Sequence, residues 1–277
     1  MSRHLLPASR FTIEALTAAY NQTRVDYLVP MPFNAARLAE YIRIYDVDMD
    51  QSVVALNGEQ ILGINMLGTR PDLCWITRLG VLPVKRRKGT GEAMMRYLLE
   101  KSDESGYPRC ILEVIKHNEP AYQLFRKLKF HETRELLVLR RAPNGPMTPP
   151  KGEVSWLNSI QSMEALSQYP IHLPWLNQVE TFQHTEDTLG IRCELPDGDR
   201  GWLVFRKQKF YLTHLVLHTE KGDPARVASA LLTYLHIKFP ILDTHTENIP
   251  LDDPHLPAFW DLGYFEVFRR IEMCREL

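Results

Sequence analysis

The sequence predicts an α/β (α+β) protein of two domains, each with a mixed, mostly antiparallel sheet flanked by helices. Three observations lead to this fold class. Short apolar runs typical of strands alternate with amphipathic helical patterns along the chain. A stretch rich in proline and glycine, residues 142–150, interrupts the alternation near the middle. The order of elements before that stretch then returns after it in a weaker form.

The first half is predicted to begin with a short strand at residues 5–10 and helices at 12–23 and 34–44. Two strands follow at 52–56 and 61–68, separated by Asn57-Gly58, a dipeptide typical of hairpin turns. A third strand at 74–82 leads through a glycine-rich junction to a helix at 92–101. A strand at 110–115, a helix at 119–128 and a strand at 133–139 complete the order.

The proline-rich stretch sets the predicted domain boundary, because such a composition does not hold a regular element. We predict an N-terminal domain at residues 1–141, a linker at 142–152 and a C-terminal domain at 153–277. The second domain is interpreted as a degenerate repeat, in which residues 241–250 align with residues 111–120. Chance similarity of two strand-helix units is the alternative, and the matched order of elements favours duplication.

Composition limits the function classes. The chain of 277 residues is 44% hydrophobic and 24% charged, which is typical of a globular protein. Its formal net charge of −1 predicts no overall attraction to nucleic acid or to a membrane surface. The four cysteines are far apart and form no C-x-x-C pair, which argues against a disulfide framework. No segment resembles a signal peptide or a membrane span, so we expect a cytoplasmic protein.

The junction after the third strand carries the strongest functional signal. Four consecutive cations, residues 85–88, precede Gly89 and Gly91, and a helical pattern starts directly behind them. Glycines let the backbone turn tightly, and the N–H groups at a helix N-terminus attract anions. The segment therefore predicts a phosphate-binding loop. It lacks the Gly-Lys-Ser/Thr of nucleotide-binding loops, which makes ATP a poorer candidate.

Over about residues 4–140 the sequence resembles the GNAT superfamily of acyl-CoA N-acetyltransferases. The match lies in Val81-Leu-Pro83 with Arg86-x-x-Gly89-x-Gly91, in Leu112-Glu113-Val114 with Asn118-x-x-Ala121-x-x-Leu124-Phe125, and in Lys129-Phe130, where Gly-Phe is usual. The resemblance implies a splayed strand pair in each sheet and acetyl-CoA as cosubstrate, with no metal. It also implies transfer to a primary amine of a small molecule or peptide, which attacks the thioester directly in a ternary complex.

The same resemblance implies roles for individual residues. Glu113 matches the general base, and its apolar neighbours predict a raised pKa; a solvent-facing carboxylate or a pair with Arg109 is the alternative. Phe125 stands where the family usually has the tyrosine that protonates the leaving sulfur. Tyr122, one turn earlier, is a possible substitute, although a packing role is favoured. The residues implied to bind the cofactor are Leu79, Gly80, Val81, Arg86, Arg87, Lys88, Gly89, Thr90, Gly91, Glu92, Asn118 and Phe125.

Three other patterns are weaker. In the second domain, Glu220-Lys-Gly-Asp-Pro224 aligns with the phosphate loop but brings carboxylates and a proline, so we predict that this domain is not catalytic. The acidic run 46–50 resembles the start of a calcium loop without its glycine and final glutamate, so capping of the helix-to-strand loop is the favoured interpretation. His214 and His218 share a strand face without a third metal ligand nearby.

The sequence thus predicts an active N-terminal acetyltransferase domain and a GNAT-like C-terminal domain that completes the acceptor pocket or braces the first. A catalytically silent acyl-CoA-binding or regulatory module is the alternative, motivated by Phe125. Binding of nucleic acid by the basic loop is disfavoured because no wider basic face accompanies it. The acceptor is not identified, and monomer and homodimer are both open. Loop 23–34 and the interdomain surface are expected to line the acceptor site.

Overall fold

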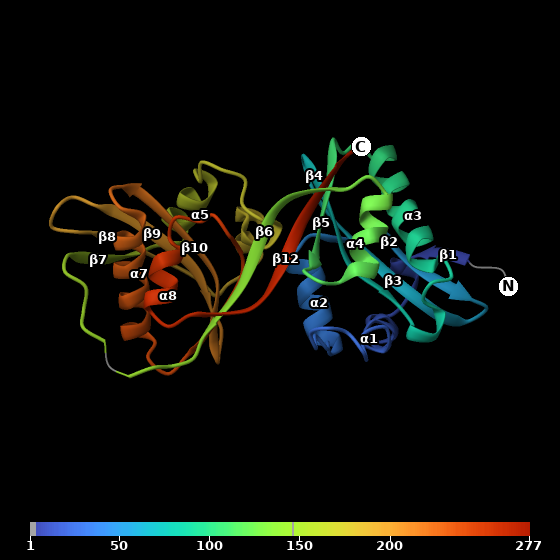
Figure 1. Cartoon of the computed structure of the whole chain (residues 1–277), viewed down its shortest axis with the longest axis horizontal. Helices are drawn as coiled ribbons and strands as arrows, with labels where there is room; N and C mark the ends of the chain where they lie inside the picture. The colour runs from blue at the N-terminus through green and yellow to red at the C-terminus, as the bar shows by residue number, and fades with distance from the viewer. Residues whose placement is uncertain (1–3, 146) are drawn as a thin grey trace. The chain divides into compact units, whose positions relative to one another are not determined.

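The computed structural model describes residues 4–145 and 147–277 and divides into two compact units (Figure 1). The first unit holds the described residues up to Thr133 together with Ile271–Leu277, and the second is Arg134–Arg270. Each unit has a mixed, mostly antiparallel sheet with helices packed against it, which confirms the predicted fold class.

The first unit contains most of the predicted elements within a few residues of their expected bounds. It opens with β1 (His4–Pro7), a 3₁₀ turn (Ala8–Arg10), α1 (Ile13–Gln22) and α2 (Ala35–Ile44). Strands β2 (Val47–Asn57), β3 (Gln60–Arg70) and β4 (Leu73–Val81) form an antiparallel meander. A 3₁₀ turn (Pro83–Lys85), α3 (Thr90–Glu104), β5 (Arg109–Ile115), α4 (Glu119–Lys127) and β6 (His131–Arg141) follow.

Local chemistry explains why these elements begin and end where they do. The side chain of Thr12 accepts a hydrogen bond from the N–H of Ala15 at 3.2 Å, and that of Asn34 accepts from Arg37 at 2.9 Å. These caps satisfy backbone donors that the first turn of a helix leaves unpaired. Between β2 and β3, Gly58 has a φ of +59°, which glycine adopts without strain.

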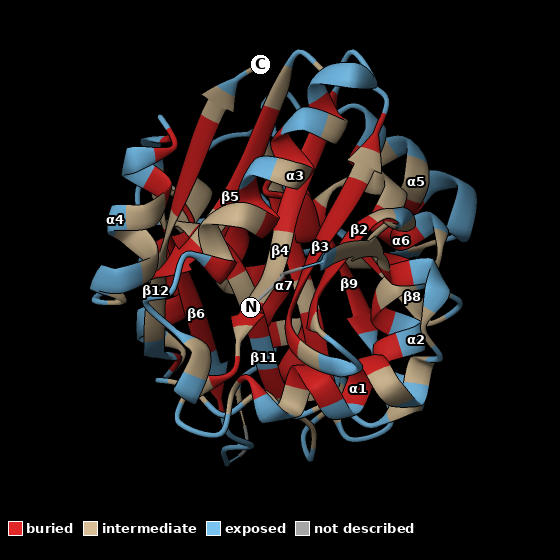
Figure 2. Cartoon of the chain, turned by 90° about the vertical axis from the view of Figure 1, so that its right-hand side faces the viewer, coloured by how far each residue is buried: buried red, intermediate tan, exposed pale blue. Residues whose placement is uncertain are grey.

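The sheet of the first unit runs in the order β1-β2-β3-β4-β5, followed by the end of β12 (Phe265–Glu276). Successive residues of β4 face opposite sides: Ile76 packs in one cluster with Met94 and Leu98 of α3, whereas the ring of Trp75 lies 6.2 Å from that of Tyr41 in α2. Buried residues follow the strands, and exposed residues lie on the outer turns of the helices (Figure 2).

The second unit repeats this plan with more irregular segments. Its elements are β7 (Glu153–Leu157), α5 (Ser159–Ser167), a 3₁₀ turn (Trp175–Asn177), α6 (Val179–Gln183), β8 (Thr188–Glu194), β9 (Arg200–Lys207), β10 (Tyr211–Lys221), α7 (Pro224–Lys238), β11 (Asp243–Pro250) and α8 (Leu256–Asp261). Its strands run in the order β6-β11-β10-β9-β8-β7. Residues from α7, α8 and these strands form one buried apolar cluster.

The order β10-α7-β11-α8 repeats β4-α3-β5-α4, and both copies carry the same bulge. Arg78 in β4 and His214 in β10 have φ values of +58° and +54° at the register shift with the neighbouring strand. The predicted alignment of residues 241–250 with 111–120, a separation of 130, is wrong. Helix α7 starts 134 residues after α3 (224 against 90), and α8 starts 137 after α4 (256 against 119). Strand β11 continues to Pro250, so its helix begins later.

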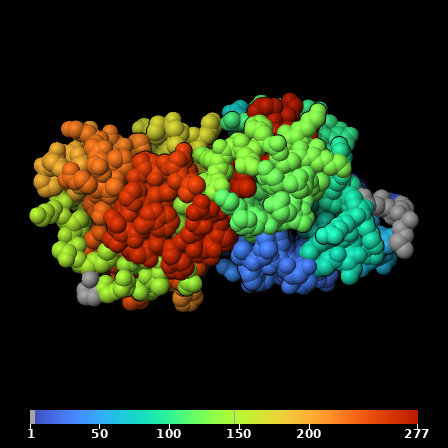
Figure 3. All heavy atoms as spheres, in the orientation of Figure 1, coloured from blue at the N-terminus to red at the C-terminus, as the bar shows by residue number. Residues whose placement is uncertain are grey.

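The compact units differ in extent from the predicted domains. The described residues of the stretch 142–152 form no regular element. The units divide earlier, between Thr133 and Arg134, so most of β6 belongs to the second unit. Strand β12 begins in the second unit, and its residues from Ile271 onward belong to the first. The red end of the chain is accordingly visible beside green and teal atoms of the first unit (Figure 3).

Candidate active site

Strands β4 and β5 separate at their carboxyl ends. Their parallel ladder pairs Cys74 with Cys110, Trp75 with Ile111 and Ile76 with Leu112, although β4 continues to Val81 and β5 to Ile115. The bulge lies just past this point, where Arg78 and Leu79 of β4 stand opposite the single residue Asn65 of β3. The splayed pair that the resemblance implied is therefore present in the first unit.

The glycine-rich segment joins the separated end of β4 to α3. Arg87 and Gly89 have left-handed backbones, with φ values of +59° and +75°, and Gly89 is the N-cap residue of α3. Thr90, Gly91 and Glu92 form the first turn of the helix, whose N–H groups have no intrahelical acceptors. The side chains of Arg87 and Lys88 are exposed on the same loop. This geometry concentrates backbone donors and positive charge at one place.

The side chain of Arg86 is engaged by partners within the protein. Its guanidinium donates to the carbonyl of Val81 at 3.1 Å, to the carbonyl of Thr23 at 2.9 Å and to both carboxylate oxygens of Asp26 at 2.7 Å. The hydrogen bonds that Asp26 accepts from Arg86 lower the pKa of Asp26. The side chain of Arg86 thus ties the glycine-rich loop to the segment that follows α1.

Glu92 also uses its side chain for structure. Its carboxylate accepts from Lys127 of α4 at 2.6 Å and from Arg96 at 2.9 Å, and these bonds lower the pKa of Glu92. The residue thereby connects α3 to α4. Only its backbone is left in the position that the predicted anion site requires.

Glu113 lies on the face of the sheet that α1 and α2 cover. Its carboxylate oxygen Oε2 accepts a hydrogen bond from the indole N–H of Trp75 at 2.9 Å, and the residue is half-buried. The rings of Tyr41 and Tyr45 lie beside the indole of Trp75, both within 6.2 Å of its ring. The guanidinium of Arg78 lies 4.4 Å from the centre of the Tyr41 ring. The raised pKa of Glu113 stays a prediction.

Tyr122 and Phe125 occupy two different environments on α4. The hydroxyl of Tyr122 donates to Glu132 at 2.5 Å, and this hydrogen bond raises the pKa of Tyr122. Phe125 is 5% exposed and packs in the apolar cluster of the first unit, with its ring centre 6.3 Å from that of Phe130. A phenol whose pKa is raised is a weaker acid, so neither residue is arranged to donate a proton readily.

The segment after α1 lies over the separated strands, which sequence reasoning anticipated only in general terms. The guanidinium of Arg24 donates to the carbonyl of Leu79 at 3.2 Å and stacks on the ring of Tyr27 at 4.3 Å. The side-chain amide of Asn118 in turn lies 3.4 Å from the Tyr27 hydroxyl. Arg24, Tyr27 and Arg78 were missed. Their partners Leu79, Asn118 and Tyr41 each lie more than 35 residues away in the sequence.

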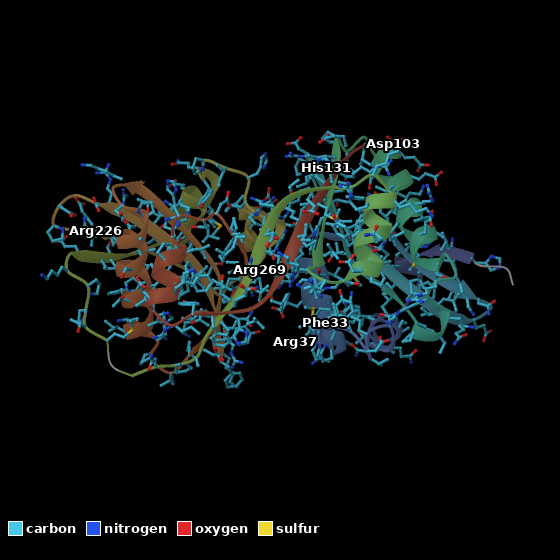
Figure 4. All side chains as sticks on the ribbon, in the orientation of Figure 1. Phe33, Arg37, Asp103, His131, Arg226 and Arg269 are labelled. Carbon is cyan, nitrogen blue, oxygen red and sulfur yellow. The ribbon has the colours of Figure 1, made fainter. Side chains whose placement is uncertain are left out.

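Close backbone packing holds that segment in place. A Cβ atom at Gly80 would lie 2.2 Å from the side-chain oxygen of Thr23, so only glycine allows α1 to end this close to β4. Phe33, which precedes α2, packs its ring 4.9 Å from that of Tyr20 in α1 (Figure 4). Gly80 therefore has a packing role in addition to its predicted place in the cofactor site.

In the second unit a carboxylate lies against the corresponding loop. The side chain of Asp199 accepts from the backbone N–H of Asp223 at 3.3 Å, and a Cβ atom at Gly222 would lie 2.0 Å from it. Arg226, labelled in Figure 4, pairs with Asp199 at 3.1 Å. Pro224 occupies the first turn of α7, where it contributes no N–H. This loop already holds an anionic group of the protein.

Hydrogen bonds and ion pairs within the protein engage the acidic run 46–50, which spans the last loop residue after α2 and the first residues of β2. The carboxylate of Asp48 accepts from the N–H groups of Asp50 at 2.8 Å and Gln51 at 3.0 Å, and Asp46 pairs with Arg70 at 2.8 Å. The bonds of Asp48 lie inside β2, so capping of the helix-to-strand loop stays a prediction. In the described part of the chain, no three His, Cys, Asp or Glu side chains gather as they would around a metal ion. Every helix among the described residues is too short or too polar to cross a bilayer.

Known proteins share this architecture. Residues 15–130 match the family model described as Acetyltransferase (GNAT) family. No curated protein matches the chain. Among solved structures, the GCN5-related N-acetyltransferase from Sphaerobacter thermophilus is 12% identical, with a TM-score of 0.76 over 99% of this chain and 95% of that one.

Two further structures resemble the chain over its whole length. A tandem GNAT protein from the clavulanic acid biosynthesis pathway is 13% identical, with a TM-score of 0.69 over 99% of this chain and 98% of that one. Eis1 from Mycobacterium abscessus is 16% identical, with a TM-score of 0.55 over 100% and 74%. The first unit is therefore a domain of the GNAT acetyltransferase family, in a chain that has the fold of a tandem GNAT protein.

Proposed function

We propose that the first unit transfers an acetyl group from acetyl-CoA to a primary amine, which attacks the thioester directly in a ternary complex. The observation that carries the proposal is the juxtaposition of two features at the end of β4. The strand separates from β5 beyond Ile76, and it leads directly into a loop that presents the first-turn N–H groups of α3. The extended arm of acetyl-CoA needs a free strand edge, and its diphosphate needs an anion site directly beside that edge.

The residues present fit a diphosphate. A Cβ atom at Gly91 would make only ordinary contacts, 3.6 Å from Leu124 and 3.7 Å from Val81. Packing within the protein therefore does not require glycine at this position. The carboxylates of Asp26 and Glu92 are paired with cations of the protein. The loop of the second unit shows the opposite arrangement, because the carboxylate of Asp199 lies against it. The difference supports cofactor binding in the first unit and its absence in the second.

Several residues would hold the cofactor. The backbones of Thr90, Gly91 and Glu92 would receive the diphosphate, with Arg87 and Lys88 adding positive charge. Leu79, Gly80 and Val81 would offer a strand edge to the arm. When bound, acetyl-CoA supplies an acetyl thioester with an electrophilic carbonyl carbon. Arg24 now occupies the carbonyl of Leu79, so we expect its side chain to move when the arm binds.

Glu113 is the proposed general base. An amine acceptor arrives as an ammonium ion and must lose a proton before its nitrogen can attack. The indole N–H of Trp75 fixes the carboxylate on the sheet face that α1 and α2 cover, at the point where the strands part. A backbone N–H near Val81 is proposed to stabilise the oxyanion, since a fixed dipole needs no reorganisation.

Neither Phe125 nor Tyr122 is arranged to protonate the leaving thiolate, which favours the second candidate function. Phe125 carries no hydroxyl, and the hydroxyl of Tyr122 is held by Glu132. A thiol with a pKa of about 8.5 departs tolerably without help, so slow catalysis is compatible with this arrangement. If acetyl-CoA binds but a panel of amines, aminoglycosides and peptide N-termini elicits no thiol release, the domain is a silent acyl-CoA-binding or regulatory module.

The cofactor site can be tested with a matched pair of glycines. Gly89 and Gly106 stand at the two ends of α3, and both have a φ of +75°. Substitution of either by alanine forces a side chain into the left-handed region, at a similar cost of about 1 kcal/mol. We expect Gly89→Ala to weaken acetyl-CoA binding at least tenfold in calorimetry, because the loop changes shape. Gly106→Ala should leave binding unchanged.

Equal affinity of the Gly89→Ala and wild-type proteins, with both folded, would remove the proposed site. The same titration separates a binding failure from a failure of turnover.

Four cysteines without disulfides fit the reducing cytoplasm, which we include in the proposal.

A further inference from the structure

The second unit contains a cavity that the proposed acetyl transfer does not use. It has a volume of about 420 Å³, which is within the range of small-molecule sites. The cavity lies between the end of β6, the segment that follows this strand, and the end of α7. Its wall includes Arg141, Asn144, Met147, His236, Ile237 and Pro240, all of the second unit.

The arginine on this wall is buried without a carboxylate partner. Arg141 is 4% exposed, and burial lowers the pKa of its guanidinium. Arginine stays charged in proteins, and a buried cation is costly unless an anion compensates it. Arg206, equally buried in the same unit, donates to both carboxylate oxygens of Asp187 at 2.7 and 3.1 Å. Arg141 forms no such ion pair with the part of the chain that the structure describes.

The contacts of Arg141 engage only part of its donors. Its Nε donates at 2.7 Å to the carbonyl of Leu262, the C-cap residue of α8. Its Nη1 lies 3.4 Å from the carbonyl of Ala142, and its Nη2 lies 3.6 Å from Sδ of Met147. Capping of α8 therefore explains the position of Nε, whereas both terminal nitrogens make long contacts with neutral groups. Because Met147 belongs to the wall, this end of the guanidinium lies beside the cavity.

The other wall residues favour an anion with an apolar body. Burial, reinforced by Arg141, lowers the pKa of His236 to about 3, so its ring is neutral near pH 7. Met147, Ile237 and Pro240 contribute apolar surface. One guanidinium matches the charge of one carboxylate, whose two oxygens can accept from two nitrogens in parallel. A phosphate dianion would keep negative charge that this wall does not compensate.

We propose that this cavity binds a small monocarboxylate with an apolar body. The terminal nitrogens of Arg141 hold the carboxylate, and the apolar body packs against Met147 and Ile237. Binding supplies the anion that the buried guanidinium lacks among the described residues. The site gives the second unit a ligand of its own, distinct from the cofactor of the first, and its occupancy does not depend on acetyl transfer.

The test is a nuclear magnetic resonance titration of the full ¹⁵N-labelled chain at pH 7. The probe is hexanoate, and hexanamide, hexylammonium and inorganic phosphate are the comparison compounds. We expect saturable hexanoate shifts for the amides of Arg141, Asn144 and Ile237. The comparison compounds lack either the carboxylate or the apolar body, so each should bind at least about tenfold more weakly.

Two substitutions of neighbouring arginines separate the site from general charge effects. Arg141→Met removes the guanidinium but keeps an unbranched side chain, and it should weaken hexanoate binding at least about tenfold. Arg140→Met removes the same charge one residue earlier, where the guanidinium is exposed and pairs with Asp243 at 2.5 Å. Adjacent residues of a strand face opposite sides, so Arg140→Met should change the affinity less than about twofold.

Arg141→Lys keeps the cation but loses the planar fork, so it should weaken hexanoate binding about three- to tenfold. This variant decides if Arg141→Met does not fold. The proposal is wrong if hexanoate gives no saturable shifts at this cavity, or if hexanamide or phosphate binds as tightly. Wild-type affinity in the folded Arg141 variants would also overturn it, as would an equal loss of binding in Arg140→Met.

Discussion

Two residues of the first unit show how a hydrogen bond determines what a side chain can do. The carboxylate of Glu113 accepts a hydrogen bond from the indole of Trp75, which orients it. The hydroxyl of Tyr122 donates to the Glu132 carboxylate, which raises the pKa of the phenol. The proposed base is therefore oriented by an indole N–H, whereas its raised pKa makes Tyr122 a weaker acid.

This contrast predicts very different effects of two isosteric substitutions on kcat. Glu113→Gln retains an oxygen that can accept from Trp75 but removes the base, so kcat should fall about 10²–10⁴-fold with acetyl-CoA affinity unchanged. The loss should shrink as pH rises and the acceptor amine deprotonates without help. Tyr122→Phe should change kcat less than twofold. Steady-state kinetics from pH 6 to 10 measure both, and wild-type kcat in Glu113→Gln would rule out the base role.

Residue types alone do not reveal which cations near the loop are engaged within the protein. Four consecutive cations predicted an anion site, yet the guanidinium of Arg86 is committed to Asp26, Thr23 and Val81. The partner Asp26 lies 60 residues away in sequence, and no local pattern announces that contact. The backbone conformation of the loop was easier to predict, because glycine adopts the left-handed conformation of Gly89 at the start of α3 without strain.

At the scale of elements, the sequence was informative wherever local chemistry decides. Helices α1 and α2 start after the capping residues Thr12 and Asn34, and the β2–β3 hairpin turns at Gly58, the second residue of the predicted dipeptide. The second copy was misaligned because β11 extends to Pro250 before α8 begins. Sequence similarity between two strand-helix units does not fix the length of the connection.

Helix α7 carries a buried histidine with a predictable effect on stability. Burial, reinforced by Arg141, lowers the pKa of His236 to about 3 in the folded protein, against 6.5 in a model peptide. The unfolded chain then binds more protons between these values, so the free energy of unfolding falls as pH falls below about 6.5. The slope approaches about 1.4 kcal/mol per pH unit.

Urea unfolding of the full chain at pH 7 and pH 5 measures this slope. His236→Gln should flatten it by removing the titrating group, after correction for any loss of the bond to Tyr264. The same substitution at the exposed His131 serves as the control. An unaltered pH dependence in His236→Gln would show that another group dominates.

At the scale of the whole molecule, the first compact unit contains both the N-terminal and the C-terminal part of the chain, and the second lies between them in sequence. Residues 134–141 of β6 belong to the second unit, and Ile271–Leu277 belong to the first. A sequence pattern locates a strand but not the sheet that it joins, which is why the predicted boundary at 142–152 follows composition alone. A fragment of residues 1–141 would lack the C-terminal strand of its own unit.

The C-terminal strand therefore provides the last test, through Met273. This side chain is fully buried in the cluster that contains Ile76 and Leu98, far along the chain from both. Met273→Ala should cost about 2–5 kcal/mol and speed hydrogen exchange in β4 and β5. Leu231→Ala, which creates a similar cavity in the cluster of α7, should act instead on β10. If Met273→Ala affected only the exchange of the second unit, the assignment of this strand to the first would be wrong.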